Sequence, residues 1–300
     1  MTALRRLAIF SAVVALLLVL GGFGLVYVGA YGIVGARNGG APPPAPSPSP
    51  SPSSDREPGE RRIDVGPPAA TLSVLVEEPK LSPRATIFVL HGIGDHKEDM
   101  QHWGDRLTTA GYRAVLVDSR GHGRSTGQWL TYGVQESRDL SRLIDALAIH
   151  GPIGVMGVSY GAATAIEWAA SEPRVAGAVA VAPFASLRDI VPVYVPRSLP
   201  LIGDFLPRWL IMRVVDRAGR LGGFDPDDAS PKAAAARTHT PILIVHGDQD
   251  TTVPMWNSAL IVAHAATARL VPMAGEDHER ISGDARLWPL ALDFFAGIFK

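Results

Sequence analysis

The sequence contains no cysteine, which excludes disulfide bonds, zinc sites with cysteine ligands and a thiol nucleophile. An excess of charge of either sign is also missing, because 28 Lys and Arg residues face 29 Asp and Glu residues and the formal net charge is −1. Such a balance gives no electrostatic reason to expect a nucleic-acid partner. Apolar residues make up 47% of the 300 residues, which indicates a sizeable core in one or two domains.

Charged residues are absent from a long stretch near the N-terminus, Leu7 to Ala36. This run exceeds the about 20 residues that span the hydrocarbon core of a bilayer, and few buried helices are apolar all round for such a length. A cleaved signal peptide is the alternative, with an apolar region of about 7–15 residues and a small-residue cleavage site. Because the run is longer and lacks a clean A-x-A site, we expect an uncleaved transmembrane signal anchor at 1–37.

The charges on either side of this segment predict its orientation. Arg5 and Arg6 precede it together with the terminal amine, and only Arg37 follows it. Under the positive-inside rule, the N-terminus lies in the cytoplasm and the rest of the chain lies outside the cell membrane. We therefore expect a single-pass membrane protein with an extracytoplasmic folded domain.

A segment rich in proline and serine follows, APPPAPSPSPSPSS at 41–54. Proline favours extended polyproline II and the segment has little apolar surface to bury, so it predicts a semi-rigid spacer. A ligand for a proline-binding domain is the alternative, but such motifs usually carry flanking basic residues. Charged residues extend the expected disordered linker over 38–65, and we expect the folded domain at 66–300.

From residue 71 onward, short β-branched runs alternate with helix-like stretches. Apolar runs without polar alternation predict strands of a sheet that is covered on both faces. Alternating strands and helices predict parallel strands joined by right-handed crossovers, and hence an α/β fold. The expected strands are 71–78, 85–92, 114–119, 153–159, 175–183, 241–247 and 268–273, and the expected helices are 99–110, 134–149, 160–171, 254–265 and 284–299.

The segment Gly157-Val158-Ser159-Tyr160-Gly161 matches the pattern G-x-S-x-G between an expected strand and an expected helix. In that setting the pattern places a serine nucleophile on a sharp turn. The turn strains the backbone at Ser159 and requires small neighbours, a demand that the two glycines meet. The alternative is that Ser159 only caps the helix beside tightly packed glycines.

A serine nucleophile needs a base, and the base needs an acid that orients it; both follow the serine along the chain, the acid first. Four histidines come after Ser159. His264 lies within an expected helix, His246 ends a strand and His239 precedes one. Only His278 lies in a loop at the carboxyl end of a strand, where it could reach the serine. We therefore predict His278 as the base.

The acid is expected in the loop HGDQDTTVP, which follows the strand at 241–247. Asp250 lies further into this loop than Asp248, which is suited to hydrogen bonds within a turn. Asp277 adjoins His278 and is too close in sequence to orient its ring. We predict Asp250 as the acid and keep Asp248 as the alternative.

Two backbone N–H groups are expected to stabilise the oxyanion of an acyl-transfer reaction. One belongs to Tyr160, directly after the nucleophile, and the other to the loop HGIGDH at 91–96, where we assign it to Ile93. The histidine and aspartate residues of that loop, with His122, could suggest a metal site. Their spacing does not place three ligands around one ion, so we expect neither a metal nor a cofactor.

With these residues the sequence resembles the α/β-hydrolase superfamily, especially its serine aminopeptidase (S33), acyl-glycerol-lipase-like and BEM46-like members. The marks of this resemblance occur in the expected order: HGIGDH (91–96), DSRGHGRS (118–125), GVSYG (157–161), APFASL (182–187), PILIVHGDQDTTVP (241–254) and the late His278. The resemblance implies an eight-stranded, mostly parallel sheet and carries the triad onto Ser159, Asp250 and His278. It also implies that Asp118 and His122 belong to the scaffold.

The resemblance further implies a short helical cap over the site, at about 187–238. Apolar side chains of the cap could line an acyl pocket; the alternative is that each packs on the body of the domain. We predict substrate contacts for four of them, Tyr194, Phe205, Trp209 and Met212. An apolar cap favours uncharged acyl substrates.

These features predict a serine hydrolase that cleaves a small-molecule ester or a related acyl compound through an acyl-enzyme. A peptidase would need an acidic site for the free amine of its substrate, which the cap does not clearly offer. An acyltransferase on the same triad is a further alternative. A non-catalytic, membrane-tethered binding module is another, although it would have no physical need for all three triad residues. The sequence makes no prediction of the oligomeric state.

Overall fold

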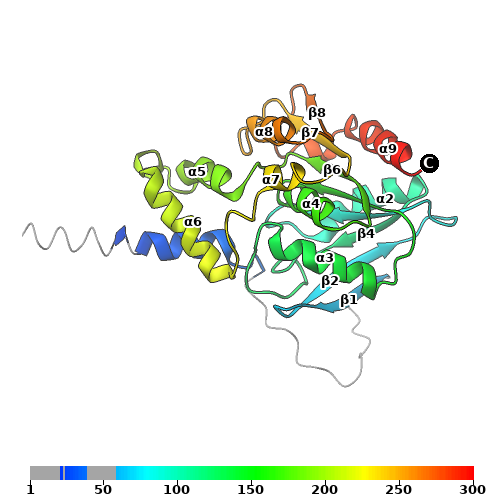
Figure 1. Cartoon of the computed structure of the whole chain (residues 1–300), viewed down its shortest axis with the longest axis horizontal. Coiled ribbons are helices and arrows are strands. Elements are labelled where there is room, and N and C mark those ends of the chain that lie inside the picture. The colour runs from blue at the N-terminus through cyan, green and yellow to red at the C-terminus, as the bar shows by residue number, and fades with distance from the viewer. Residues whose placement is uncertain (1–20, 23, 39–58) are drawn as a thin grey trace, which may run out of the picture.

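The structure of the chain, a computed structural model, describes residues 21–22, 24–38 and 59–300 (Figure 1). Most of the expected anchor and residues 39–58 of the expected linker lie outside the described residues. Within the described ranges, no helix combines the length and the apolar composition needed to cross a membrane.

Eight strands form one sheet in the order β1-β2-β4-β3-β5-β6-β7-β8. Their bounds are β1 Glu60–Val65, β2 Ala70–Glu77, β3 Thr86–Leu90, β4 Arg113–Val117, β5 Ile153–Val158, β6 Val175–Val181, β7 Ile242–Gly247 and β8 Ala268–Met273. The pairs β1–β2 and β2–β4 are antiparallel, and every other neighbouring pair is parallel. The α/β fold with a mostly parallel, eight-stranded sheet is thereby confirmed.

Helices cover both faces of the sheet (Figure 1). Their bounds are η1 Lys97–Met100, α2 Gln101–Thr109, α3 Val134–Ala146, α4 Tyr160–Ser171, α5 Leu187–Ser198, η2 Gly203–Phe205, α6 Arg208–Gly222, α7 Pro231–Ala235, α8 Trp256–His264, η3 Ile281–Gly283 and α9 Leu287–Ile298. Apolar residues of α3, α4 and α8 share one core with the sheet, and those of α2 and α9 share a second. Between these layers β3, β5 and β7 are entirely buried, as expected of apolar runs without polar alternation.

Strand β1 begins within the segment that we expected to be linker. Its sequence ERRIDV pairs antiparallel with β2 along its whole length at the edge of the sheet. Of its six residues only Val65 is buried. A mostly exposed edge strand with four charged residues among six has the composition of a linker, which explains the missed strand. The folded domain therefore begins before Gly66.

The cap consists of α5, η2, α6 and α7, between β6 and β7. Pro192 and Pro196 lie inside α5, so the prolines that made this region look irregular do not prevent a helix there. Figure 1 shows α5 and α6 at one end of the molecule, beside a blue helix over residues 24–34, here called the N-terminal helix.

The N-terminal helix is part of the folded domain. Ala30 and Val34 have no exposed surface and belong to the same apolar cluster as residues of the cap. Directly after the helix, Gly35 forms an antiparallel bridge with Trp129. The expected boundary of the anchor at residue 37 therefore differs from the structure, because residues 24–38 pack on the domain that follows.

Candidate active site

Ser159 lies between β5 and α4 with φ of 52° and ψ of −111°. Such a conformation costs a non-glycine residue about 1–3 kcal/mol and is typical of functional sites. Close packing maintains the turn. A Cβ atom on Gly157 would lie 2.4 Å from the backbone of Gly161, and one on Gly161 would lie 2.4 Å from the carbonyl oxygen of Leu90. Both neighbours must therefore be glycine, as the sequence pattern indicated.

The structure brings Ser159, His278 and Asp250 together. His278 lies in the loop after β8, with Nε2 3.0 Å from Ser159 Oγ and Nδ1 2.7 Å from Asp250 Oδ2. A carboxylate only accepts hydrogen bonds, so the Nδ1–H of His278 donates to Asp250 and Nε2 accepts from the serine hydroxyl. This tautomer is the one that a base needs in order to take the proton of Ser159.

Asp250 is held at the carboxyl end of β7 by contacts on both carboxylate oxygens. The backbone N–H of Val253 donates to Oδ1 at 2.8 Å, and His246 Nε2 lies 3.2 Å from Oδ2. Burial raises the pKa of Asp250, but hydrogen bonds from His246 and His278 outweigh burial and hold this pKa well below its usual range. The carboxylate therefore stays ionised beside the His278 ring.

His246 is a contributor that the sequence analysis did not identify. Its ring is fully buried, and Nε2 also lies 2.7 Å from the carbonyl oxygen of Val253. Because a carbonyl only accepts, Nε2 carries the hydrogen, and Nδ1 accepts from the hydroxyl of Ser258 at 2.6 Å. In the sequence, the signal for this contact is that His246 and Asp250 lie four residues apart, across the turn that follows β7.

The other acidic candidates have separate roles. Asp248 is exposed and accepts a hydrogen bond from the backbone N–H of Gly275 at 2.8 Å, which joins the loops after β7 and β8. Asp277 pairs with Arg280 at 2.9 Å. Among the described residues, the hydrogen bonds of the His278 ring go to Ser159 and Asp250. The geometry thus favours Asp250 over both.

Both predicted oxyanion donors lie beside the serine. Tyr160 is the first residue of α4, where a backbone N–H has no partner within the helix and the helix dipole is positive. Ile93 lies in the loop after β3 and lines the same cavity as Ser159 and Tyr160.

The histidines near that loop pack under the site. The rings of His91 and His122 are 4.9 Å apart, and His91 Nε2 accepts a hydrogen bond from the backbone N–H of Ser119 at 3.1 Å. Burial lowers the pKa of His91 to about 4 and that of His122 to about 3, so both rings are uncharged at neutral pH. Asp118 pairs with the buried Lys97 at 3.1 Å. These contacts favour scaffold roles, and the described residues include no cluster of three or more metal-ligating side chains.

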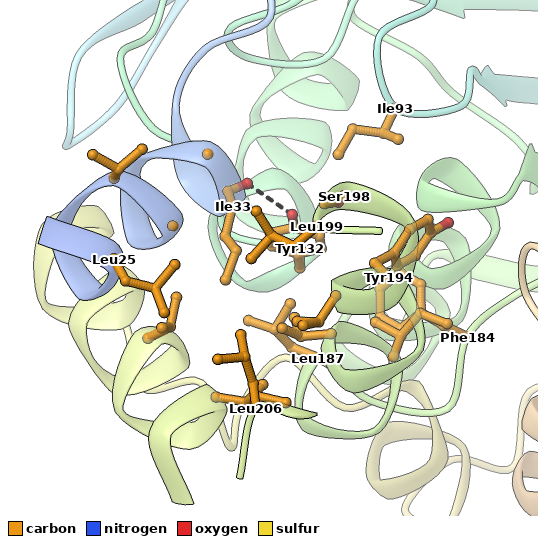
Figure 2. Close-up of a pocket in the computed structure, with 18 of the residues that line it drawn as sticks. Leu25, Ile33, Ile93, Tyr132, Phe184, Leu187, Tyr194, Ser198, Leu199 and Leu206 are labelled. Carbon is orange, nitrogen blue, oxygen red and sulfur yellow. Dashed lines mark hydrogen bonds between the residues drawn. The ribbon is translucent and has the colours of Figure 1, made fainter. Parts of the chain in front are cut away.

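A cavity of about 370 Å³ opens beside Ser159 (Figure 2). This volume lies within the about 300–1,000 Å³ that is usual for small-molecule sites. The cap forms one side of the cavity and the N-terminal helix forms another. Nearly all of the lining side chains are apolar, and Arg37 is the one charged residue among the described residues that line it.

Of the four substrate contacts predicted in the cap, only Tyr194 lines this cavity. The side chains of Phe205 and Trp209 point outward and are 84% and 67% exposed. Met212 instead lies against Arg188, with its sulfur 4.0 Å from the guanidinium. These three residues do not line the cavity beside Ser159: Phe205 ends η2, and Trp209 and Met212 lie on other faces of α6 than the residues that line it. The residues of α6 that face the cavity are Leu210, Ile211 and Val214.

Comparison with known proteins found a matching family model and several proteins with sequences similar to this chain. A family model described as serine aminopeptidase, S33, matches residues 81–224. The chain is 27% identical over 179 residues to the uncharacterized protein YqkD of Bacillus subtilis (strain 168), and the match covers 57% of this chain and 56% of that protein. It is 25% identical over 225 residues to a monoacylglycerol lipase of Mycolicibacterium smegmatis, covering 63% of this chain and 78% of the lipase.

Solved structures resemble the chain over a larger part of its length. The Pyrococcus furiosus esterase Pf2001 matches with a TM-score of 0.61 and 20% identity, over 80% of this chain and 93% of the esterase. At that identity the likeness concerns the fold. Together with the sheet order, it shows that this chain has the α/β-hydrolase fold.

Proposed function

We propose that this chain, as an α/β-hydrolase-fold protein, is a serine hydrolase that cleaves an ester or a related acyl compound. One observation carries the proposal: Ser159, His278 and Asp250 form a continuous hydrogen-bonded chain whose serine end faces an apolar cavity. The similarity to a monoacylglycerol lipase and to an esterase supports hydrolase chemistry.

In the proposed reaction, Ser159 Oγ attacks the carbonyl carbon of the substrate while its proton passes to Nε2 of His278. The ionised Asp250 stabilises the resulting imidazolium, which gives its proton to the leaving alcohol oxygen. The N–H groups of Ile93 and Tyr160 stabilise the oxyanion. Water, deprotonated by the same imidazole, then attacks the acyl-enzyme, releases the acid and restores Ser159.

The cavity lining supports an uncharged acyl substrate over a peptide with a free amine. Among the described residues that line the cavity there is no carboxylate, and the charge that is present belongs to Arg37. A protonated amine would be repelled by that charge and would find no partner for a buried ion pair. An acyl acceptor other than water would use the same acyl-enzyme and the same residues.

Covalent labelling tests the nucleophile. A fluorophosphonate probe should label the full-length chain at Ser159, because the activated Oγ attacks the phosphorus and the adduct is stable. Ser159→Ala should abolish the label, whereas Ser198→Ala, which removes another hydroxyl that lines the cavity, should retain it. A wild-type protein that is not labelled at Ser159 would contradict the proposal and favour a binding module.

A substrate panel separates the two classes of hydrolase. The unlabelled wild-type enzyme should hydrolyse p-nitrophenyl esters faster than aminoacyl p-nitroanilides at equal concentration. The reverse order would indicate a peptidase on the same three residues.

We also propose that the charge-free residues 7–23, a length at the lower end of the about 17–25 residues of a membrane helix, anchor the chain in the cell membrane, with the N-terminus in the cytoplasm and the catalytic domain on the other side. The composition of that run and the arginines before it support the proposal. Large apolar side chains are exposed on the N-terminal helix and the cap, at one end of the molecule (Figure 1), where they favour lipid over water. They are Tyr27, Val28, Tyr31, Leu201, Ile202, Phe205 and Trp209.

Carbonate extraction tests the anchor. The full chain should stay with the membranes, and protease added outside spheroplasts should digest the catalytic domain.

The double change Leu16→Arg and Leu18→Arg should release the protein, because each arginine at the centre of a membrane helix costs about 2.5–3.5 kcal/mol. Leu81→Arg is the matched control, since Leu81 is exposed in the loop after β2. Release of the wild-type chain from the membranes by carbonate would contradict the proposed membrane anchor.

A further inference from the structure

We propose that the N-terminal helix is one wall of the acyl pocket and that Gly32 on this helix limits how long an acyl chain the pocket accepts. The inference rests on the proposed function, because it assigns the acyl group of the substrate to the cavity beside Ser159. The helix contributes Leu25, Val28, Gly29, Gly32 and Ile33 to the lining of the cavity.

Backbone hydrogen bonds fix the position of this helix on the catalytic domain. The hydroxyl of Tyr132 donates to the carbonyl oxygen of Ile33 at 2.7 Å (Figure 2). The N–H of Leu130 donates to the carbonyl oxygen of Val34 at 2.8 Å. Because these acceptors are backbone atoms, a change of side chain on the cavity face leaves the attachment of the helix intact.

The helix also packs against the cap. A Cβ atom on Gly29 would lie 3.0 Å from a methyl group of Val214, so glycine at this position allows a close approach to α6. At the next turn toward the N-terminus, the guanidinium of Arg217 lies 4.4 Å from the centre of the Tyr27 ring. The wall is thus held between the body of the domain and the cap.

The residues that line the cavity follow a helical repeat. Counted from Leu25, the lining residues Gly29, Gly32 and Ile33 follow after four, seven and eight residues, which places them near one face of the helix. Figure 2 shows Leu25 and Ile33 of this face across the cavity from the cap side chain Leu206. A side chain added at position 32 would leave the helix on the same face and enter the cavity.

At Gly32, the N-terminal helix has space for a larger side chain. A Cβ atom there would meet no other atom within 4 Å, and Gly32 is one of the residues that line the cavity, so a larger side chain would displace no packed contact. A leucine at this position would occupy space that the acyl chain otherwise uses. It would also favour the helix, because leucine has a higher helix propensity than glycine.

The test is the acyl-length profile of Gly32→Leu in the full-length chain, measured with p-nitrophenyl esters from acetate to dodecanoate. Burial of one methylene changes binding about fourfold, so displacement of two to four methylenes should lower kcat/KM for long esters relative to acetate by about 15- to 250-fold. Labelling of Ser159 by a small fluorophosphonate should persist in this variant, because the triad is unchanged, and kcat/KM for acetate serves as the reference for each enzyme. Leu25→Ala, which widens the same wall, should shift the preferred length upward.

Gly24→Leu is the matched control. Gly24 lies about 12 Å from Gly32 along the same helix, is not part of the cavity lining and has no atom within 4 Å of an added Cβ. Its acyl-length profile should equal that of wild type. An unchanged acyl-length profile in Gly32→Leu, with wild-type esterase activity intact, would contradict the proposal that the N-terminal helix is a wall of the acyl pocket. It would leave the proposed function in place. Absence of esterase activity and of labelling in the wild-type chain would instead contradict the proposed hydrolase function, on which the inference about the acyl pocket rests.

Discussion

His278→Ala is expected to lower kcat/KM for p-nitrophenyl butyrate by about 10⁵- to 10⁶-fold, because no other described base lies within hydrogen-bond distance of Ser159 Oγ. Without the imidazole, the serine hydroxyl keeps its proton and attacks slowly. The residual rate comes from substrate binding and the oxyanion donors. Steady-state kinetics on the purified full-length chain measures the loss.

The control for this change is His264→Ala. His264 is exposed near the end of α8, and the sequence analysis had set it aside because it lies within a helix. Its removal should leave kcat/KM within about twofold of wild type. Circular dichroism should show that both variants are folded. A His278→Ala enzyme that retains a tenth of the wild-type rate would mean that another group serves as the base.

Asp250→Asn is expected to lower kcat by about 10⁴-fold with little change in KM. An amide has nearly the shape of the carboxylate, but it carries no charge to stabilise the imidazolium, and its NH₂ group favours the tautomer of His278 in which Nε2 holds the hydrogen. Ser159 would then face a donor rather than an acceptor. Because the pKa of Asp250 is held well below its usual range, a loss of wild-type rate between pH 8 and 5 does not come from protonation of this carboxylate.

Asp248→Asn distinguishes this role from a general effect of charge. Asp248 lies two residues away, carries the same charge and accepts a hydrogen bond from Gly275 that an asparagine oxygen can also accept. Its kcat should remain within about threefold of wild type, since exposed charges at this distance are screened by water. Equal losses in both variants would point to Asp248 as a functional acid as well.

The triad could be predicted from the sequence because each member follows a strand that was itself easy to identify. The runs before Ser159 and Asp250 are apolar throughout, as expected of strands buried on both faces. Parallel strands bring their carboxyl ends to one edge of the sheet, which places residues far apart in sequence beside each other. The strand before His278, β8, is partly exposed, unlike the other two strands. Its position next to β7 brings His278 to the edge of the sheet where Asp250 lies.

The cap pocket could not be predicted to the same accuracy. Its helices lie on the surface, so apolar residues occur on more than one face, and the sequence does not tell which face turns inward. Trp209 and Leu210 are neighbours in α6, yet Trp209 is exposed and Leu210 lines the cavity. Tertiary packing decides this, because Ile211, Val215 and Ala218 of α6 are buried in a cluster with Ala30 and Val34 of the N-terminal helix.

The N-terminal helix shows a second limit of sequence-based prediction. An apolar face that packs on protein and one that packs on lipid have the same composition, so a hydropathy argument includes residues 24–37 in the expected anchor. The structure instead buries Ala30 and Val34 against the domain. No composition rule could have found the hydrogen bond between Tyr132 and Ile33, which lie far apart in sequence.

The attachment of this helix changes what a single proteolytic cut between residues 39 and 58 would produce. The helix and the strand β1 lie on opposite sides of that stretch, and both are bound to the same body by backbone hydrogen bonds. A cut there would leave two fragments associated without a covalent link, in the manner of a split protein. The N-terminal helix is therefore part of the folded body, and its separation would require dissociation as well as cleavage.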